Sequence, residues 1–309
     1  MNKNRILSYW ATAVFIVAFL GWGVGCKMAK PFKGEAKILV APAPFSLSMV
    51  EARFLFLTDY LTEQTGWKIE TVGAPPSLDE FLKILTAQKI AFSFQNPYFY
   101  LHLAEKHGAV PLVKTVSLDG LSEFRGMIIA QEKSPIKSPG DLIGKKILVS
   151  DRNSVGGFLA QYMLLKDFGL DPEKELIFLF GDTQEKIMEK VALGQAEVGF
   201  IREDVLQAMI RARGSMTGVK VIALTPFHPT HCLVSYPKTD PVLSEKVKTA
   251  LLNLTPENPS HRFILERLRI SRFTQASAEE YQTFNKVLML HGLFVPGPLS
   301  KLKEQETKR

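Results

Sequence analysis

The stretch Leu142-Ile-Gly-Lys-Lys-Ile-Leu-Val-Ser150, followed by Asp151-Arg-Asn-Ser-Val-Gly-Gly-Phe158, decides the fold that we expect for this chain. It predicts a short helical turn, a strand that ends near Ser150, a polar loop, and a helix from Ser154 to Asp167. A strand that leads through a short loop into a helix is the repeating unit of α/β proteins. The start of such a helix, with its free N–H groups and its dipole, favours an anion.

The same alternation continues on both sides of this stretch. Capping boxes predict helices that start at Ser77, Asp182 and Ser277, because Ser or Asp followed three residues later by Glu satisfies exposed amides. Further helices are expected at 48–63, 97–106 and 203–211, and strands at 36–40, 67–72, 90–94, 110–116, 126–131, 176–180, 197–201 and 220–224. Alternating strands and helices predict an α/β protein with doubly wound, mostly parallel sheets.

The alternating units divide into two blocks. We expect a signal or anchor segment at 1–26, a first lobe at 27–131, a second lobe at 132–226, a return into the first lobe at 227–296, and a mobile tail at 297–309. In open α/β sheets, ligands bind at the carboxyl ends of the strands. The loops at 42–46, 95–97, 151–157 and 181–183 are therefore where a site is expected.

The N-terminal segment predicts export from the cytoplasm. Lys3 and Arg5 precede an uncharged stretch at 6–25, which is followed by Cys26. About 20 apolar residues are enough to cross a bilayer as a helix. Three alternatives remain open: a lipoprotein signal with Cys26 as the lipidated residue, an uncleaved membrane anchor, and a cleaved signal peptide. All three place residues 27–309 outside the cytoplasm.

Composition excludes several classes of protein. Of the 309 residues, 46% are hydrophobic and 22% charged, so the chain as a whole is neither disordered nor fibrous. The net charge of +7 is dispersed and suits an anionic small ligand or simple solubility, and it does not argue for nucleic acid. Two cysteines, Cys26 and Cys232, cannot form a disulfide framework.

The chain offers little that indicates catalysis or a metal. His228-Pro-Thr-His231-Cys232 places two histidines and a thiol close together, but a structural zinc site needs four ligands and no partner cluster follows. No nucleophile–base motif is present either. We therefore expect no metal, no cofactor and no enzymatic activity.

Several stretches together resemble a known family. They are Gly126-Met-Ile-Ile-Ala-Gln-Glu-Lys-Ser-Pro-Ile136, Asp141-Leu-Ile-Gly-Lys-Lys146, Asp151–Phe158, Asn96-Pro-Tyr-Phe-Tyr100 and Gly194-Gln-Ala-Glu-Val-Gly199. In this order they resemble the extracytoplasmic solute-binding subunits of phosphate, phosphite and phosphonate ABC importers. The resemblance implies a type II periplasmic-binding-protein fold, in which two α/β lobes, joined by two crossover strands, close on a ligand like a hinge.

The resemblance also implies a ligand site. In the family, the residues that correspond to Ser154–Phe158 are a hydroxyl-rich Ser-Thr-Ser-Gly-Tyr; this chain keeps Ser154 and Gly157 but has lost two hydroxyls at Val155 and Gly156. Thr183 stands where the family often has a ligand-binding histidine. The predicted ligand-binding residues are Phe45, Ser46, Asn96, Tyr98, Tyr100, Ser154, Val155, Gly156, Gly157, Thr183 and Arg202.

Several of these residues also have a purely structural interpretation. Ser154 can be a helix cap only, Tyr98 and Tyr100 can be packing residues, and Arg202 can lie in solvent instead of supplying the positive charge that the missing histidine leaves open. Asn96 stands where glycine is usual in the family, whereas Tyr100 fits its pocket tyrosine.

Two functions follow from the sequence. The first is a monomeric, membrane-tethered binding protein that captures a small oxyanion, related to phosphonate or phosphate, and presents it to an ABC permease. The second is a tethered sensory or interaction module, in which the same fold carries an altered pocket. The hydroxyls lost at Val155 and Gly156 motivate this alternative.

Overall fold

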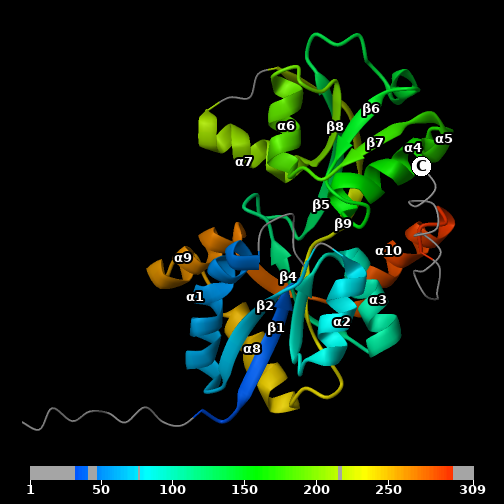
Figure 1. The fold of residues 1–309 in the computed structure, drawn as a ribbon. Coiled ribbons are helices and arrows are strands. Elements are labelled where there is room, and N and C mark those ends of the chain that lie inside the picture. Colours follow the sequence, from blue (N-terminus) through cyan, green and yellow to red (C-terminus); the bar gives the residue numbers. More distant parts are fainter. Residues whose placement is uncertain (1–31, 41–46, 76, 215–217, 295–309) are drawn as a thin grey trace, which may run out of the picture. The chain divides into compact units, whose positions relative to one another are not determined.

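The computed structural model describes residues 32–40, 47–75, 77–214 and 218–294 (Figure 1). Within them lie two β-sheets, each flanked by helices. The strands of the first sheet are β1 (Glu35–Val40), β2 (Lys68–Gly73), β3 (Phe92–Gln95), β4 (Val110–Val116), β10 (Cys232–Ser235) and β11 (Arg272–Gln275). The strands of the second sheet are β5 (Glu123–Gln131), β6 (Lys146–Val149), β7 (Ile177–Phe180), β8 (Val198–Arg202) and β9 (Val219–Pro229).

Helices connect the strands of both sheets. The helices next to the first sheet are α1 (Leu47–Thr65), α2 (Leu78–Ala87), α3 (Pro97–His107), α8 (Pro241–Leu252), α9 (Pro259–Leu268) and α10 (Ala278–Leu290). Those next to the second sheet are η1 (Pro139–Leu142), η2 (Val155–Leu159), α4 (Ala160–Asp167), α5 (Pro172–Glu175), α6 (Gln184–Ala192) and α7 (Glu203–Arg213). The predicted α/β class and the two lobes are confirmed.

Both sheets are mixed, which differs from the mostly parallel sheets that the sequence predicted. The first sheet has the order β11-β4-β10-β3-β1-β2, in which β1 is parallel to β2 and β3 while β10 and β11 run antiparallel to their neighbours. The second has the order β7-β6-β8-β5-β9, in which only the pairs β6–β7 and β6–β8 are parallel. The strands adjacent to a passage between the lobes run opposite to their neighbours, because the chain enters and leaves each lobe there.

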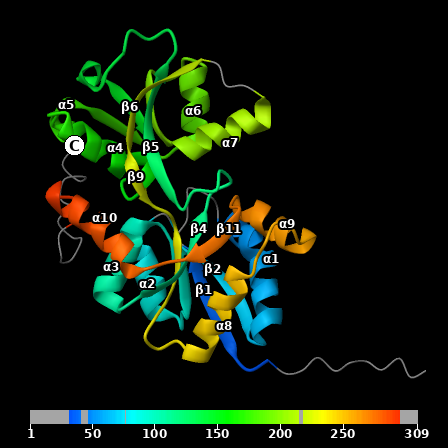
Figure 2. The ribbon, with the colours of Figure 1, turned by 180° about the vertical axis from the view of Figure 1, so that it is seen from behind.

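The two passages between the sheets lie next to each other. The chain enters the second sheet between β4 and β5 and returns between β9 and β10, and β5 and β9 pair antiparallel over most of their length (Figure 2). Their register shifts between Arg125 and Met127, where the Gly126 N–H donates to the Thr225 hydroxyl at 2.8 Å. The predicted lobe boundary after residue 131 falls at the far end of β5, and that after 226 falls inside β9.

Apolar side chains hold the lobes together internally and also where they meet. One core cluster belongs to the first lobe and packs α1, α8 and α9 on the sheet, and another belongs to the second lobe and packs α6 and α7. A third contains residues of both lobes, among them Phe81 of α2 and Phe200 of β8. Fully burying a side chain of this size contributes about 1.5–3 kcal/mol.

The predicted helix starts are confirmed at Ser77 and Ser277, whose side chains accept hydrogen bonds from the backbone of Glu80 and Glu280. The predicted start at Asp182 is wrong by one residue. Thr183 is the cap of α6, and its hydroxyl accepts from the Lys186 N–H at 3.2 Å. Asp182 pairs instead with the Lys190 ammonium, at 2.6 Å.

Candidate functional site

A cavity of about 280 Å³ lies between residues of the two lobes. The first lobe contributes residues of α1, α3, α9 and the segment after β9, and the second contributes the starts of η2, α6 and α7. Six of the predicted site residues line it: Asn96, Ser154, Val155, Gly156, Thr183 and Arg202. Phe45, Ser46 and the predicted lipidation residue Cys26 lie outside the described residues.

Tyr98 and Tyr100 do not line the cavity, and this corrects their place in the predicted set. Both are 3% exposed. Tyr98 packs against His102, and the Tyr100 ring meets Tyr281 at 4.6 Å. The first turn of α3 instead directs Phe99 to the cavity, so the aromatic residue at the site is the one between the two tyrosines.

Gly157 also lies outside the lining, but its neighbours require glycine. A Cβ atom at this position would lie 2.2 Å from the Ser150 hydroxyl, which is closer than any real contact. Ser150 itself lines the cavity and is 4% exposed, and its hydroxyl has no hydrogen-bond partner among the described residues. A buried hydroxyl without a partner costs stability unless a ligand or water completes it.

Four helix starts meet at this cavity. Asn96 caps α3 and Ser154 caps η2, their side chains accepting from Phe99 N–H at 2.9 Å and Gly157 N–H at 3.1 Å. Thr183 caps α6, and Arg202 stands at the cap position of α7. Each helix start carries free N–H groups and the positive end of a helix dipole, so their convergence favours an anion.

The helix that Ser154 begins has an irregular first turn. Val155–Leu159 form a π-helical turn, in which the Leu159 N–H bonds the Ser154 carbonyl at 2.9 Å. The buried Gln161 amide donates to the carbonyls of Gly156, Ile201 and Met127. It thereby ties this turn to β8 and β5, the strands that carry the cavity wall and the passage between lobes. Single π-helical turns occur frequently at functional sites.

In the described part of the chain, polar contacts join the lobes across the cavity at two places. The Asn96 side-chain amide donates to the Asn153 carbonyl at 3.1 Å, and the Arg269 guanidinium pairs with the Glu185 carboxylate at 2.6 Å. Asn96 thus acts twice, because its oxygen caps a first-lobe helix while its nitrogen holds a second-lobe loop.

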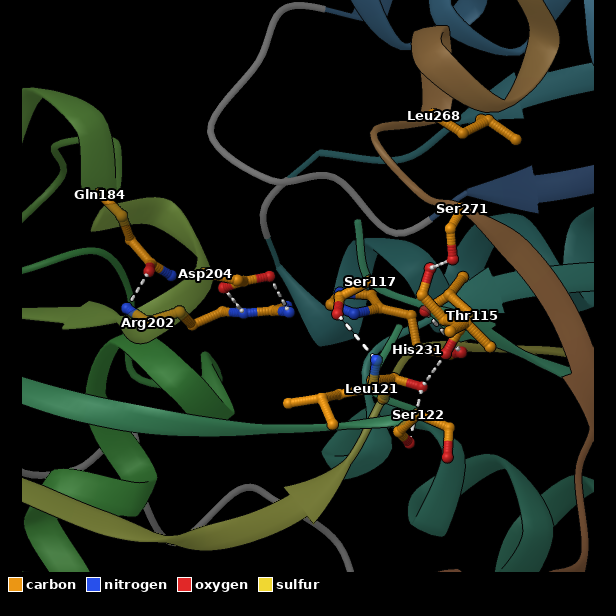
Figure 3. A network of polar contacts seen from close by, with 12 residues as sticks. Thr115, Ser117, Leu121, Ser122, Gln184, Arg202, Asp204, His231, Leu268 and Ser271 are labelled. Atoms are coloured by element: carbon orange, nitrogen blue, oxygen red, sulfur yellow. Dashed lines mark hydrogen bonds and ion pairs between the residues drawn. The ribbon is translucent and has the colours of Figure 1, made fainter. Parts of the chain in front are cut away.

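The charged groups at the cavity balance one another. Three arginines and three carboxylates line it: Arg53, Arg202, Arg269, Asp151, Glu185 and Asp204. Arg202 pairs with Asp204 through two parallel hydrogen bonds of 2.8 and 2.6 Å (Figure 3). Arg53 donates to the carbonyls of Arg267 and Leu268, and burial lowers its pKa to about 10. An anion in this cavity would therefore be attracted by donor groups and helix ends rather than by an excess of cations.

Burial also shifts the pKa values of two further titratable groups at the cavity. Burial raises the pKa of Asp151 to about 6, although hydrogen bonds from the backbone of Asn153 and Ser154 oppose this shift. Burial and, to a lesser degree, the Arg202 charge lower the pKa of His231 to about 3, so this ring is neutral at physiological pH. It stacks on Phe94 with 5.8 Å between centroids. Figure 3 shows His231 and Ser117 on one side and Arg202 with Asp204 on the other.

Sequence reasoning missed several lining residues, among them Arg53, Phe124, Ser150, Gln184, Asp204 and His231. Ser150 and Gln184 lie next to the loops at 151–157 and 181–183, where the sequence predicted a site. Their position in the sequence could therefore have indicated them. His231 was weighed only as a metal ligand. In the described part of the chain, no group of three His, Cys, Asp or Glu residues is placed to hold a metal ion.

Two α/β lobes with a cavity between them are the architecture of two-lobed solute-binding proteins. The chain belongs to the family of periplasmic substrate-binding proteins of phosphonate ABC transporters, whose model matches residues 40–281. Proteins of this family bind a substrate for transport and are not enzymes. The family places the chain outside the cytoplasm. Among the helices of the described residues, none combines the length and the apolar character needed to cross a membrane.

Solved structures share the type II periplasmic-binding-protein fold. A binding protein of an ABC phosphonate transporter from Pseudomonas aeruginosa matches with a TM-score of 0.71 at 16% identity, over 88% of this chain and 94% of that one. PhnD1 from Prochlorococcus marinus, solved in complex with methylphosphonate, matches with a TM-score of 0.72 at 15% identity, over 84% of this chain and 99% of that one.

A curated relative has a different role. The tetrathionate sensor histidine kinase TtrS of Salmonella typhimurium is 24% identical over 202 residues, which are 58% of this chain and 33% of that protein. The chain thus spans about a third of the length of this relative.

Proposed function

We propose that this protein captures a small oxyanion of the phosphonate or phosphate type between its lobes and delivers it to an ABC permease. The observation that carries the proposal is the meeting of four helix starts at one cavity, around Asn96, Ser154, Thr183 and Arg202. Interactions of anions with helix starts contribute about 0.3–1 kcal/mol each at exposed sites and up to about 2 kcal/mol where partly buried. Four together supply a useful share of the affinity of a micromolar ligand.

The ligand site in this proposal consists of the six predicted residues that line the cavity, together with Ser150. Phe45 and Ser46 lie outside the described residues and stay in the proposed site as the sequence predicted them. Tyr98 and Tyr100 act indirectly in it, because they pack the first turn of α3 against Phe294 and Tyr281.

We further propose that the protein works as a monomer and that residues 1–26 direct it outside the cytoplasm, through a lipid on Cys26, an uncleaved helix or a cleaved signal. The lobe boundaries after residues 131 and 226, with a tail from 297, are part of this proposal. The two neighbouring passages of the chain between the sheets, from β4 to β5 and from β9 to β10, support the division into two lobes.

A thermal-shift panel on the full chain, purified in mild detergent, tests the proposed ligand class. Methylphosphonate, phosphite, phosphate, methanesulfonate and acetate are compared, each up to millimolar concentration. A ligand present at 100 times its Kd adds about 2.7 kcal/mol to the free energy of unfolding, which is a readily measured increase in Tm. A panel in which no phosphorus oxyanion raises the Tm contradicts the proposal.

A second candidate function is a sensor of an anion on the same fold. The match of 202 residues to a tetrathionate sensor kinase favours it, as does the loss of two family hydroxyls at Val155 and Gly156. Tetrathionate is therefore added to the same panel. A Tm increase with tetrathionate, and none with the phosphorus oxyanions, selects the sensory function over uptake.

A further inference from the structure

Gly156 and Arg202 belong to different segments of the second lobe but meet at the cavity. A Cβ atom on Gly156 would lie 2.3 Å from Cγ and 2.8 Å from Cδ of Arg202, and 2.8 Å from the Phe124 ring. Since no side chain tolerates such distances, the stem of Arg202 occupies the space that any other residue at position 156 would fill.

The guanidinium of Arg202 is held on several sides. It lies over the Phe124 ring, 4.2 Å from the ring centroid, and Asp204 accepts from Nε and Nη2. The Arg202 N–H donates to the Gln184 side-chain oxygen at 2.7 Å, which fixes the backbone at the start of α7 (Figure 3). A planar cation that is stacked and paired in this way keeps one orientation, so it loses little entropy when it binds a ligand.

Part of this guanidinium is unused. It has five N–H groups, and Asp204 accepts from two of them. No hydrogen bond of the other three occurs among the described residues. The side chain is 16% exposed and lines the cavity. Donors in this position need an acceptor, because a partly buried cation with unused N–H groups is otherwise poorly solvated.

We propose that the unused edge of Arg202 is the main anion-binding group of this site, and that Gly156 is the specificity position that admits it. The proposal rests on the proposed function and names its ligand class: an oxyanion head with two adjacent oxygen atoms that accept from one guanidinium, as in a phosphonate or a sulfonate. Asp204 and Phe124 orient the group. The hydroxyls lost at Val155 and Gly156 are thus replaced by a permanent cation, which donates hydrogen bonds and accepts none.

Calorimetric titration of the full chain with methylphosphonate and, separately, methanesulfonate tests this assignment. The variant Arg202→Gln removes the charge and is expected to weaken binding of the better probe about 10- to 100-fold, which corresponds to the loss of one or two charge-assisted hydrogen bonds. Arg202→Lys keeps the charge but not the paired donors, so its affinity is expected to lie between those of Arg202→Gln and the unaltered protein. The stronger of the two probes tells whether the head is a phosphonate or a sulfonate.

The role of Gly156 is tested by a double-mutant cycle. Gly156→Ala must displace Arg202 and is expected to weaken binding as much as Arg202→Gln does, while the double variant binds no more weakly than either one. A purely structural role for Gly156 would instead add its loss to that of Arg202→Gln. Gly140→Ala is the matched control, because a Cβ there meets nothing closer than 3.8 Å. The Tm of each variant shows whether it is folded. If Gly156→Ala does not fold, Arg202→Gln and Arg202→Lys still decide the assignment.

Arg211→Gln is the matched control for charge. It removes one cation from the same helix, where Arg211 pairs with Asp119 away from the cavity lining, and is expected to leave affinity unchanged. If Arg202→Gln binds a probe as tightly as the unaltered protein does, this assignment is overturned while the proposed function stands. If the unaltered protein binds neither probe but binds phosphate or phosphite in the thermal-shift panel, the same variants are titrated with that anion. If it binds none of these anions, the proposed function fails, and the assignment fails with it.

Discussion

Replacing Asn96 by serine separates two tasks that this side chain performs at once. Its oxygen caps α3 by accepting from the Phe99 N–H, and its nitrogen donates across the cavity to the Asn153 carbonyl. Serine caps helices about as well as asparagine does, but its hydroxyl is too short to reach the opposite lobe. Asn96→Ser therefore keeps the helix start and removes the contact between lobes.

The expected loss can be estimated from that one contact. A neutral hydrogen bond of 3.1 Å contributes about 0.5–1.5 kcal/mol. The contact exists only while the lobes are together, and a ligand that touches both lobes needs them together. The loss therefore appears in the affinity for methylphosphonate, as a Kd about 2- to 12-fold higher, and the Tm of the ligand-free protein changes little.

Titration calorimetry measures the Kd, and thermal unfolding without ligand measures the Tm. Asn96→Ala is the control that loses the cap as well, so it is expected to bind like Asn96→Ser but to lose a further 0.5–2 kcal/mol or so of stability. The reasoning is refuted if Asn96→Ser binds methylphosphonate as tightly as the unaltered protein, because the contact across the cavity then contributes nothing to closure on the ligand.

Three other outcomes follow from buried groups. Burial lowers the pKa of His102 to about 4, so its contribution to stability, present above the unfolded pKa of about 6.5, is lost as pH falls toward 4. His102→Phe should therefore flatten the fall of Tm between pH 6.5 and 4. An unchanged slope of Tm against pH would contradict this role of His102. Burial raises the pKa of Asp151 to about 6, so the folded state binds this proton more tightly and loses stability as pH rises from about 4 to 6. Asp151→Asn should raise the free energy of unfolding by about 2–3 kcal/mol at pH 7.5 and by almost nothing at pH 4. Chemical denaturation at the two pH values measures this difference. Gln161→Leu removes one amide that donates to three buried carbonyls, and should lower the free energy of unfolding by about 2–4 kcal/mol. A loss below 1 kcal/mol or so would mean that water replaces the amide.

Local patterns in the sequence were sufficient to predict much of the fold. The caps at Ser77 and Ser277 depend on contacts three residues apart, so their residue types alone indicate them. The same logic could have found two helices that were missed. Asp240-Pro241 and Asn258-Pro259 place a capping residue directly before a proline at the first helical position, and α8 and α9 begin there.

The site could be predicted only in part, because its geometry depends on residues far apart in the chain. Tyr98, Phe99 and Tyr100 are all aromatic, so nothing local indicates which of them faces the cavity. Packing of α3 against Tyr281 decides it. Likewise, the dependence of Gly156 on Arg202 exists only after β8 has been placed beside the helix that Ser154 begins.

The paired strands β5 and β9 limit how the two lobes can move. Two separate linkers would let one lobe bend, twist and slide against the other, but two hydrogen-bonded strands form a ribbon that resists twisting and sliding. At the register shift, where the Thr225 hydroxyl receives the Gly126 N–H, β5 also begins to pair with β8. Residues 123–125 beyond it pair with β9 alone, so we expect the ribbon to bend there most easily. We therefore expect lobe closure to have essentially one degree of freedom, so that a single distance between one label on each lobe would follow the whole motion.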